Sequence, residues 1–137
     1  MVNIEIIQKK IGKLKEHIAI LEKIQKYSKD TFIKDPVIHG AAERYLQLAI
    51  ESIFDVGNHI ISDKNFRKPA TYFDILFILK EEKILAEKTF EEVKGMAGFR
   101  NALVHDYLDL NLEIVYDVLM KKTDVLKKII REYIELL

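Results

Sequence analysis

IEIIQKKIGKLKEHIAILEKIQKY, residues 4–27, is the stretch that decides the fold. Apolar residues recur in it at alternating steps of three and four, and such a seam is typical of a helix that packs lengthwise on another. Asn3 precedes the stretch and is a suitable N-cap. We therefore expect a helix from about Asn3 to Tyr27, packed along a long partner helix. Its seam consists of Ile4, Ile7, Ile11, Leu14, Ile18, Leu21 and, at the end, Gln25.

A second long helix is expected from Asp35 to about Ser62. Asp35 can cap it, and Pro36 suits the first helical position because its missing N–H would have no partner there. Apolar residues cover most of its circumference, so this helix should be central and contacted on several sides. The polar stretch 63–69, DKNFRKP, predicts an exposed loop after it.

Capping signals mark two further helices. Thr71, with Asp74 three residues later, resembles a capping box and predicts a helix that ends near Glu82. The last helix is expected to begin at Asp109 or Asn111 and to run to the C-terminus.

A helical segment from about Ala86 to Leu103 lies between these two helices. Gly95 and Gly98 interrupt it, so we expect a bend or a close backbone approach there. Four long helices and one shorter one predict an all-α fold, an up-and-down helical bundle, in a single domain over residues 1–137.

Composition limits the class of protein. The 137 residues balance 22 Lys and Arg against 22 Asp and Glu, which argues against a uniformly basic nucleic-acid binder. The absence of cysteine excludes a disulfide framework and a thiolate metal site. Neither a secretory signal nor an apolar stretch long enough for a membrane span is visible, so we expect a cytoplasmic protein without a membrane partner.

The densest polar cluster is FRNALVHDY, residues 99–107. Histidine exchanges protons near neutral pH and arginine is a permanent planar cation, so Arg100 and His105 make phosphoryl chemistry plausible. A step of five turns an ideal helix by about 140°, so the two would not share a face. Either the helix distorts or ends between them, or another chain completes the pair. Tyr107, seven positions after Arg100, would share its face on a continuous helix.

The pattern Arg100-Asn101-x-x-x-His105-x-Tyr107 resembles the R-x4-H-x-Y signature of the HepT toxins within the HEPN superfamily. Residues 43–61, ERYLQLAIESIFDVGNHII, are similar to the second helix of that family, and residues 96–99, MAGF, to its usual approach to the motif. The resemblance implies a HEPN-type helical bundle that forms a homodimer and cleaves RNA without metal or cofactor. It also implies a minimal nucleotidyltransferase antitoxin as partner.

The resemblance assigns roles to individual residues. Arg100 and His105 match the catalytic pair, and Asn101 matches the polar position beside the arginine. Tyr107 matches the tyrosine that the partner enzyme modifies with AMP, which silences the nuclease. We take Asp106, within the same cluster, as a further supporting residue together with Asn101.

The expected chemistry follows from the substrate. RNA carries its own nucleophile, the 2′-OH, so cleavage needs a base, an acid and a cation rather than a metal-bound water. Two motifs that meet across a two-fold axis would supply two histidines and two arginines. AMP on Tyr107 would add bulk and negative charge beside this site and would block RNA.

Two i,i+4 pairs on the second helix, His39 with Glu43 and Asp55 with His59, have a spacing that could serve a metal. Intrahelical hydrogen bonds or a buried, satisfied histidine explain them more simply, because no further ligand pair completes the set. Asp55 and His59 could instead support the cleft of the dimer.

Two other functions stay open at this point. One is a HEPN-type interaction module that binds a nucleotidyltransferase or a nucleotide without cleaving RNA. The other is a helical scaffold dimer. The intact set of Arg100, His105 and Tyr107 favours the nuclease over both.

Overall fold

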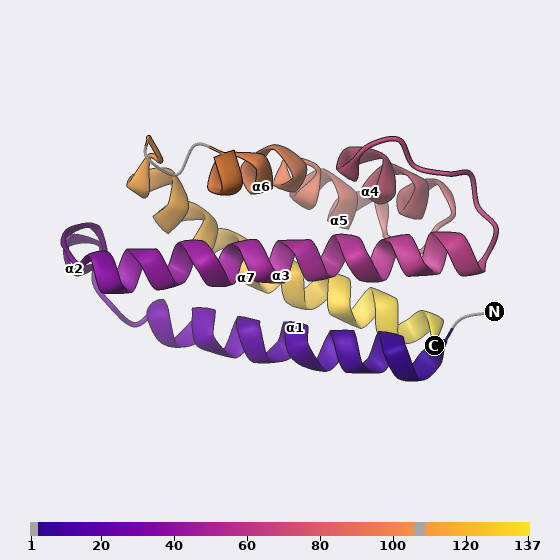
Figure 1. Ribbon diagram of the computed structural model, residues 1–137, viewed down its shortest axis with the longest axis horizontal. Helices are drawn as coiled ribbons and strands as arrows, with labels where there is room; N and C mark the ends of the chain where they lie inside the picture. The colour runs from indigo at the N-terminus through magenta and orange to yellow at the C-terminus, as the bar shows by residue number, and fades with distance from the viewer. Residues whose placement is uncertain (1–2, 106–108) are drawn as a thin grey trace.

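The computed structural model describes residues 3–105 and 109–137, and within these ranges the chain forms helices and no strand. The helices are α1 (Ile4–Ile24), α2 (Lys29–Lys34), α3 (Pro36–Asp63), α4 (Tyr72–Glu81), α5 (Glu87–Val93), α6 (Met96–His105) and α7 (Leu112–Leu136). The α4 and α6 helices lie along one side of α3, and α1 lies along the other (Figure 1). The predicted helical bundle is confirmed. No helix of the described residues is long and apolar enough to cross a membrane.

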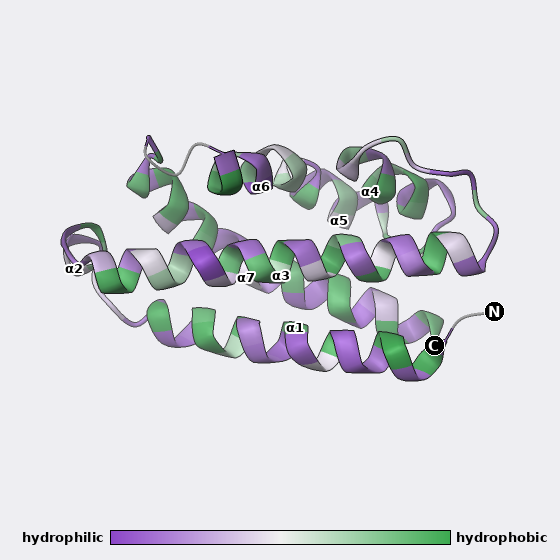
Figure 2. Cartoon of the chain, viewed as in Figure 1, coloured by the Kyte–Doolittle hydropathy of each residue, from purple (hydrophilic) through white to green (hydrophobic). Residues whose placement is uncertain are grey.

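The α1 helix has the predicted N-cap and the predicted seam. Asn3 Oδ1 accepts a hydrogen bond of 3.3 Å from the backbone N–H of Ile6. The seam is buried from Ile7 to Leu21 and packs on α3 and α7, whereas Ile4 is 46% exposed and Gln25, which follows the helix, is half-buried. At its end, Gln25 donates through Nε2 to the Leu119 carbonyl of α7 at 2.9 Å. Hydrophobic and hydrophilic residues alternate along α1 and α3, as the burial of one face of each helix requires (Figure 2).

The α3 helix begins as expected and is the centre of the bundle. Asp35 Oδ1 accepts from the Val37 N–H at 2.9 Å, and Pro36 occupies the first helical position. The helix contacts α1, α2, α4, α6 and α7. Its buried residues are Ala42, Leu46, Ala49, Ile50, Ile53, Phe54, Val56, Gly57, Ile60 and Ile61.

The helices differ from the sequence-based expectation in two places. The short α2, capped by Ser28 and anchored by the fully buried Phe32, is absent from the expectation. The segment after Ala86 is two helices, because the chain breaks between α5 and α6 next to Gly95. Of the two expected alternatives, the interruption of the helix is confirmed, and no close backbone approach occurs, since a Cβ on Gly95 or Gly98 would meet open space.

The α4 and α7 helices begin at N-caps that the sequence predicted. Thr71 Oγ1 accepts from the Asp74 N–H at 3.1 Å, and Asp74 Oδ2 accepts from the Ala70 N–H at 2.9 Å. This arrangement differs from a capping box by one residue, because the carboxylate reaches the N–H before the N-cap. Of the two candidates for the start of α7, Asn111 is the cap, and its Oδ1 accepts from the Glu113 N–H at 3.0 Å.

Gly57 marks the closest packing in the core. A Cβ there would lie 2.9 Å from side-chain atoms of Ile75, Leu79 and Tyr133. The Tyr133 hydroxyl is buried and donates to the Ile53 carbonyl at 2.9 Å. Burial raises the pKa of the Tyr133 hydroxyl, with a smaller contribution from the Glu132 carboxylate, so the hydroxyl stays a donor. Glycine at this position therefore lets α3, α4 and α7 meet.

We expect Gly57→Ala to destabilise the protein by about 1–3 kcal/mol, because the added methyl group overpacks the contact and displaces the Tyr133 hydroxyl. Urea unfolding followed by circular dichroism measures the change.

Gly40→Ala is the matched control, since Gly40 lies in the same helix and its Cβ would meet open space. This variant should be more stable than the wild type by about 0.5–1 kcal/mol, from the better helix propensity of alanine. Equal effects of the two substitutions would contradict the packing described for Gly57.

Candidate active site

The Arg100 side chain is held between α6 and α3. Its Nε and Nη2 atoms each lie 3.2 Å from Oε1 of Glu51, and its Nη1 donates to Asn101 Oδ1 at 3.3 Å. The side chain is 18% exposed. Because a guanidinium carries five N–H groups, each terminal nitrogen keeps a second N–H for an anion.

An aromatic ring supports the same guanidinium from α4. The Arg100 Cζ lies 5.0 Å from the centre of the Tyr72 ring, within cation–π distance. Tyr72 in turn stacks on the buried ring of Phe54, with centres 4.9 Å apart and planes 23° apart. Gln47 donates to Glu51 Oε1 at 3.1 Å and so fixes the carboxylate. Arg100 is therefore positioned by two other helices before any ligand binds.

His105 is exposed and is the last residue of α6. The helix is continuous from Met96 to His105, so it neither breaks nor ends between Arg100 and His105. The two side chains are consequently turned by about 140° from each other and displaced by about 7.5 Å along the axis. Within one chain they do not face the same point. Asp106 and Tyr107, the other expected site residues, lie outside the described residues.

Glu51 and Tyr72 are the site residues that the sequence did not identify. The available signal for Glu51 was a polar stripe on an otherwise apolar helix, formed at steps of four by Glu43, Gln47, Glu51, Asp55 and His59. Nothing in the local sequence points to Tyr72, because its role depends on how α4 packs beside α6.

Neither i,i+4 histidine pair forms the intrahelical hydrogen bond that was one of the two simpler explanations. His39 Nδ1 lies 3.6 Å from Glu43 Oε2, and His59 Nε2 lies 3.7 Å from Asp55 Oδ1, both beyond hydrogen-bond distance. Asp55 instead pairs with Lys10 of α1 at 2.5 Å. Among the described residues, no three His, Asp or Glu side chains form a group that could hold a metal ion.

The fourth histidine, His17, also has a structural explanation. Its ring packs on Tyr45 with centres 5.7 Å apart. Burial lowers its pKa, and the charges of Lys13 and Arg44 add to this effect against Glu16. His17 is therefore neutral at pH 7 and belongs to the packing of α1 on α3.

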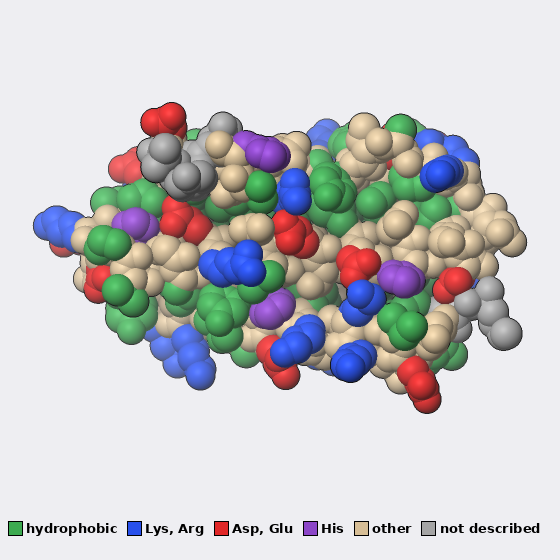
Figure 3. Space-filling model, in the orientation of Figure 1, with side chains coloured by type: hydrophobic (Ala, Val, Ile, Leu, Met, Phe, Trp, Pro, Cys, Tyr) green, Lys and Arg blue, Asp and Glu red, His purple; other side chains and the backbone are tan. Residues whose placement is uncertain are grey.

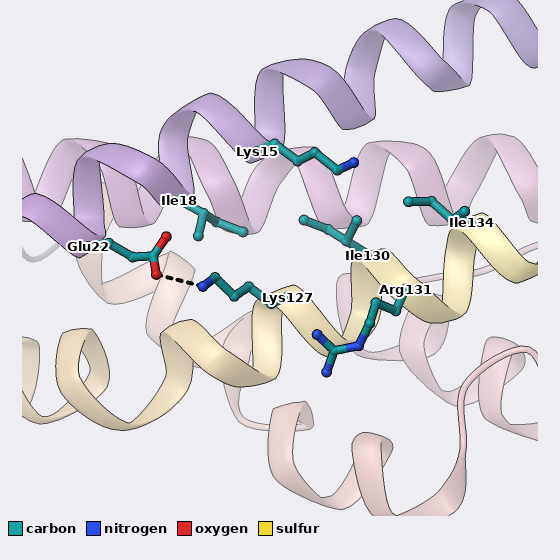
Figure 4. Close-up of a pocket in the computed structure, with 7 residues that line it drawn as sticks. All are labelled: Lys15, Ile18, Glu22, Lys127, Ile130, Arg131 and Ile134. Carbon is teal, nitrogen blue, oxygen red and sulfur yellow. Dashed lines mark hydrogen bonds and ion pairs between the residues drawn. The ribbon is translucent and has the colours of Figure 1, made fainter.

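A depression of about 340 Å³ between α1 and α7 is a rival location (Figure 4). Its floor is apolar, and Lys127 reaches across it to Glu22 at 2.6 Å. It shares no residue with the surroundings of Arg100, and its lining residues include no histidine, serine or tyrosine. Its lining residues are Lys15, Ile18, Glu22, Lys127, Ile130, Arg131 and Ile134.

Charges of both signs are interspersed over the face that carries α3 and α1 (Figure 3). No large patch of one sign covers this face, in agreement with the zero net charge of the chain. Recognition of an anion at this site would therefore depend on individual, well-positioned side chains rather than on the electrostatic potential of the whole chain.

The chain is similar to known proteins over most of its length. A family model described as HepT-like, ribonuclease HepT-like, matches residues 14–133. The mRNA nuclease HepT of Shewanella oneidensis is 30% identical over 118 residues, 83% of this chain and 85% of that protein. YutE from Bacillus subtilis, described as a cytosolic protein of unknown function, has a TM-score of 0.88 at 26% identity, covering 99% of this chain and 91% of its own. A tri-AMPylated HEPN toxin from Shewanella oneidensis, solved with its MNT antitoxin, has a TM-score of 0.86 at 26% identity, covering 96% and 98%.

The contact of Arg100 with Glu51 gives a measurable coupling. In a double-mutant cycle of Glu51→Gln and Arg100→Gln, we expect a coupling energy of about 1 kcal/mol in urea unfolding, because the pair is partly shielded from water.

The pair of Lys127 with Glu22 is the control, since its side chains are 37% and 43% exposed. Its coupling should stay below about 0.5 kcal/mol, because solvent screens it more strongly. A coupling near zero between Glu51 and Arg100 would contradict the positioning role of Glu51.

Proposed function

Because the chain belongs to the ribonuclease HepT-like family, we propose that it is the toxin of a toxin–antitoxin pair, an endoribonuclease that works as a homodimer. The observation that carries this proposal is the continuity of α6 through Arg100 and His105. A helix without a break turns the two catalytic candidates apart, so one chain supplies an incomplete site. A second copy related by a two-fold axis would bring its own pair to the same cleft.

The composite site has the groups that RNA cleavage requires. One His105 takes the proton of the 2′-OH while that oxygen attacks the neighbouring phosphorus. The P–O bond to the 5′-oxygen breaks, and the partner's His105 donates a proton to this leaving oxygen. The free N–H groups of Arg100 stabilise the charge on the pentacoordinate phosphate. The products are a 2′,3′-cyclic phosphate and a 5′-hydroxyl, and no metal-bound water takes part.

An antitoxin of the minimal nucleotidyltransferase class is the second part of the proposal. It is supported by the structural relative that is AMPylated and bound to its MNT antitoxin. In this chain the acceptor would be Tyr107, two residues after His105. AMP attached there adds bulk and negative charge beside the cleft and excludes the RNA phosphates.

We place this pair in the cytoplasm. RNA substrate and ATP are both available there, and the similar protein YutE is described as cytosolic.

Purified protein should cleave RNA in the presence of EDTA and give products that end in 2′,3′-cyclic phosphate. His105→Ala should lower the rate by at least about 100-fold, because it removes the acid and the base. Mass spectrometry of the products and gel assays measure both results. Cleavage by His105→Ala at the wild-type rate would refute the mechanism, and a binding module without nuclease activity would give no cleavage at all.

Subunit mixing tests the composite site in the same assay. An equal mixture of wild type and His105→Ala, re-equilibrated, should retain about a quarter of the activity, since one dimer in four pairs two wild-type chains. Independent protomers would retain about half. A monomer in light scattering at micromolar concentration would also refute the composite site.

A separate prediction concerns the modification of Tyr107. Incubation with ATP and the cognate nucleotidyltransferase should add one or more AMP groups to Tyr107 and abolish cleavage. Peptide mass spectrometry locates the adduct, and Tyr107→Phe should stay unmodified and active. An adduct on another residue would contradict the assignment of Tyr107.

A further inference from the structure

Two adjoining depressions lead away from Arg100 along α3. The first has a volume of about 590 Å³ and lies between α3, α6 and the start of α4. The second has a volume of about 330 Å³, lies between the end of α3 and the loop after it, and shares Asn58 and Pro69 with the first. Asn101, whose Oδ1 accepts from Arg100, lines the first depression. The depressions therefore begin one side chain away from the proposed scissile phosphate.

The first depression suits an uncharged, planar group. No charged side chain lines it, and two aromatic residues at its edge, Tyr72 and Phe73, are 40% and 41% exposed. Both rings have aromatic neighbours, Tyr72 with Phe54 and Phe73 with Phe77 and Phe90, and both still expose apolar surface at the depression. Two carboxamides, on Asn58 and Asn101, can donate and accept hydrogen bonds at the edge of a nucleobase.

The second depression combines an aromatic residue with a cation. Phe66 and Lys68 line it, and neither depression has a carboxylate among its lining residues. Lys64 and Lys68 are exposed, and neither has an ion-pair partner in the described part of the chain. Basic side chains that alternate with aromatic surfaces are the usual means of binding single-stranded nucleic acid.

The backbone fixes the loop that carries these side chains. Asn65 has a positive φ of 55°, which asparagine tolerates better than most residues. The Phe66 N–H donates to the Ile61 carbonyl at 3.1 Å, and the Asn65 N–H donates to the Ser62 carbonyl at 3.2 Å. These two bonds end α3 as a Schellman motif. The loop that arches from α3 to α4 in Figure 1 therefore starts from a defined position.

We propose that the two depressions form a path for the RNA strand next to the cleavage site. In this inference, which rests on the proposed function, one nucleobase fills the first depression against Phe73 and the two asparagines. The strand then continues past Phe66, with a phosphate near Lys68 and Lys64. The path runs along α3 from Glu51 to Ser62, a length of about 16 Å, which accommodates a few nucleotides.

A free nucleotide could supply the same base, but the geometry favours a strand. A mononucleotide with two or three phosphates needs several cations or a backbone cradle close to its base. The first depression has no cation among its lining residues, whereas Arg100 and Lys68 lie at its two ends. Cations separated in this way match the successive phosphates of one strand.

Photocrosslinking tests the path with the wild-type protein. The probe is a short 2′-O-methyl RNA, which lacks the nucleophile, with 5-iodouridine placed at successive positions. Crosslinks mapped by mass spectrometry should fall on Phe73, Tyr72 or Phe66. Tyr27 is the internal control, since it is 48% exposed and lines neither depression. Crosslinks confined to Tyr27 or to other aromatic residues outside the path would overturn the proposal.

Binding of the same RNA, followed by fluorescence anisotropy, tests the individual contacts. Phe73→Ala should weaken binding by about fivefold or more through lost stacking. Lys64→Glu with Lys68→Glu should weaken it by at least about tenfold at moderate salt and should flatten the salt dependence. Lys121→Glu, an exposed lysine of α7 outside both depressions, should change binding by less than about twofold. A loss for Lys121→Glu as large as that for the double variant would overturn the path.

The outcomes separate this inference from the proposed function. Crosslinks on the path without cleavage by the wild type would support the path and refute the nuclease. Cleavage with crosslinks elsewhere would refute the path alone. Displacement of the RNA by ATP or AMP at a lower concentration than unlabelled RNA requires would assign the first depression to a free nucleotide and overturn the strand.

Discussion

The central place of α3, which five helices contact, is the constraint on which the rest of the structure depends. Two carboxylates in its middle, on side chains that are 34% and 47% exposed, pair with cations of two of these helices. Glu51 meets Arg100 of α6, and Asp55 meets Lys10 of α1. The carboxylates of the central helix thus link it to α6 and to α1. The cation proposed for catalysis is also one of the ties that hold the bundle together.

The parts of the fold that the sequence predicted are those fixed by local interactions. Asn3, Asp35, Thr71 and Asn111 cap helices because each side chain reaches an N–H two or three residues ahead. The seam of α1 followed from periodicity alone. The hydrophobic pattern does not predict α2, because a helix of six residues is too short to show a period.

The site was predictable only in part, because its contacts are long-range. The spacing of Arg100 and His105 is visible in the sequence, and so is the angle between them once the helix is known to be continuous. The choice of Glu51 rather than Asp55 as the partner of Arg100 depends on how α6 lies on α3, across 49 positions of the chain. The same packing brings Tyr72 against the guanidinium.

The pairing of Arg100 with Glu51 has opposite effects on position and on charge. The carboxylate fixes the guanidinium, but it also cancels most of its field, so a single chain attracts RNA only weakly at this point. The remaining N–H groups can still bind a phosphate without breaking the pair. In the proposed dimer, attraction would then come from the second protomer and from the cations along the proposed RNA path. On the proposed function, a chain with no net charge binds RNA by this division of roles, in which Arg100 orients the phosphate while other groups attract the strand.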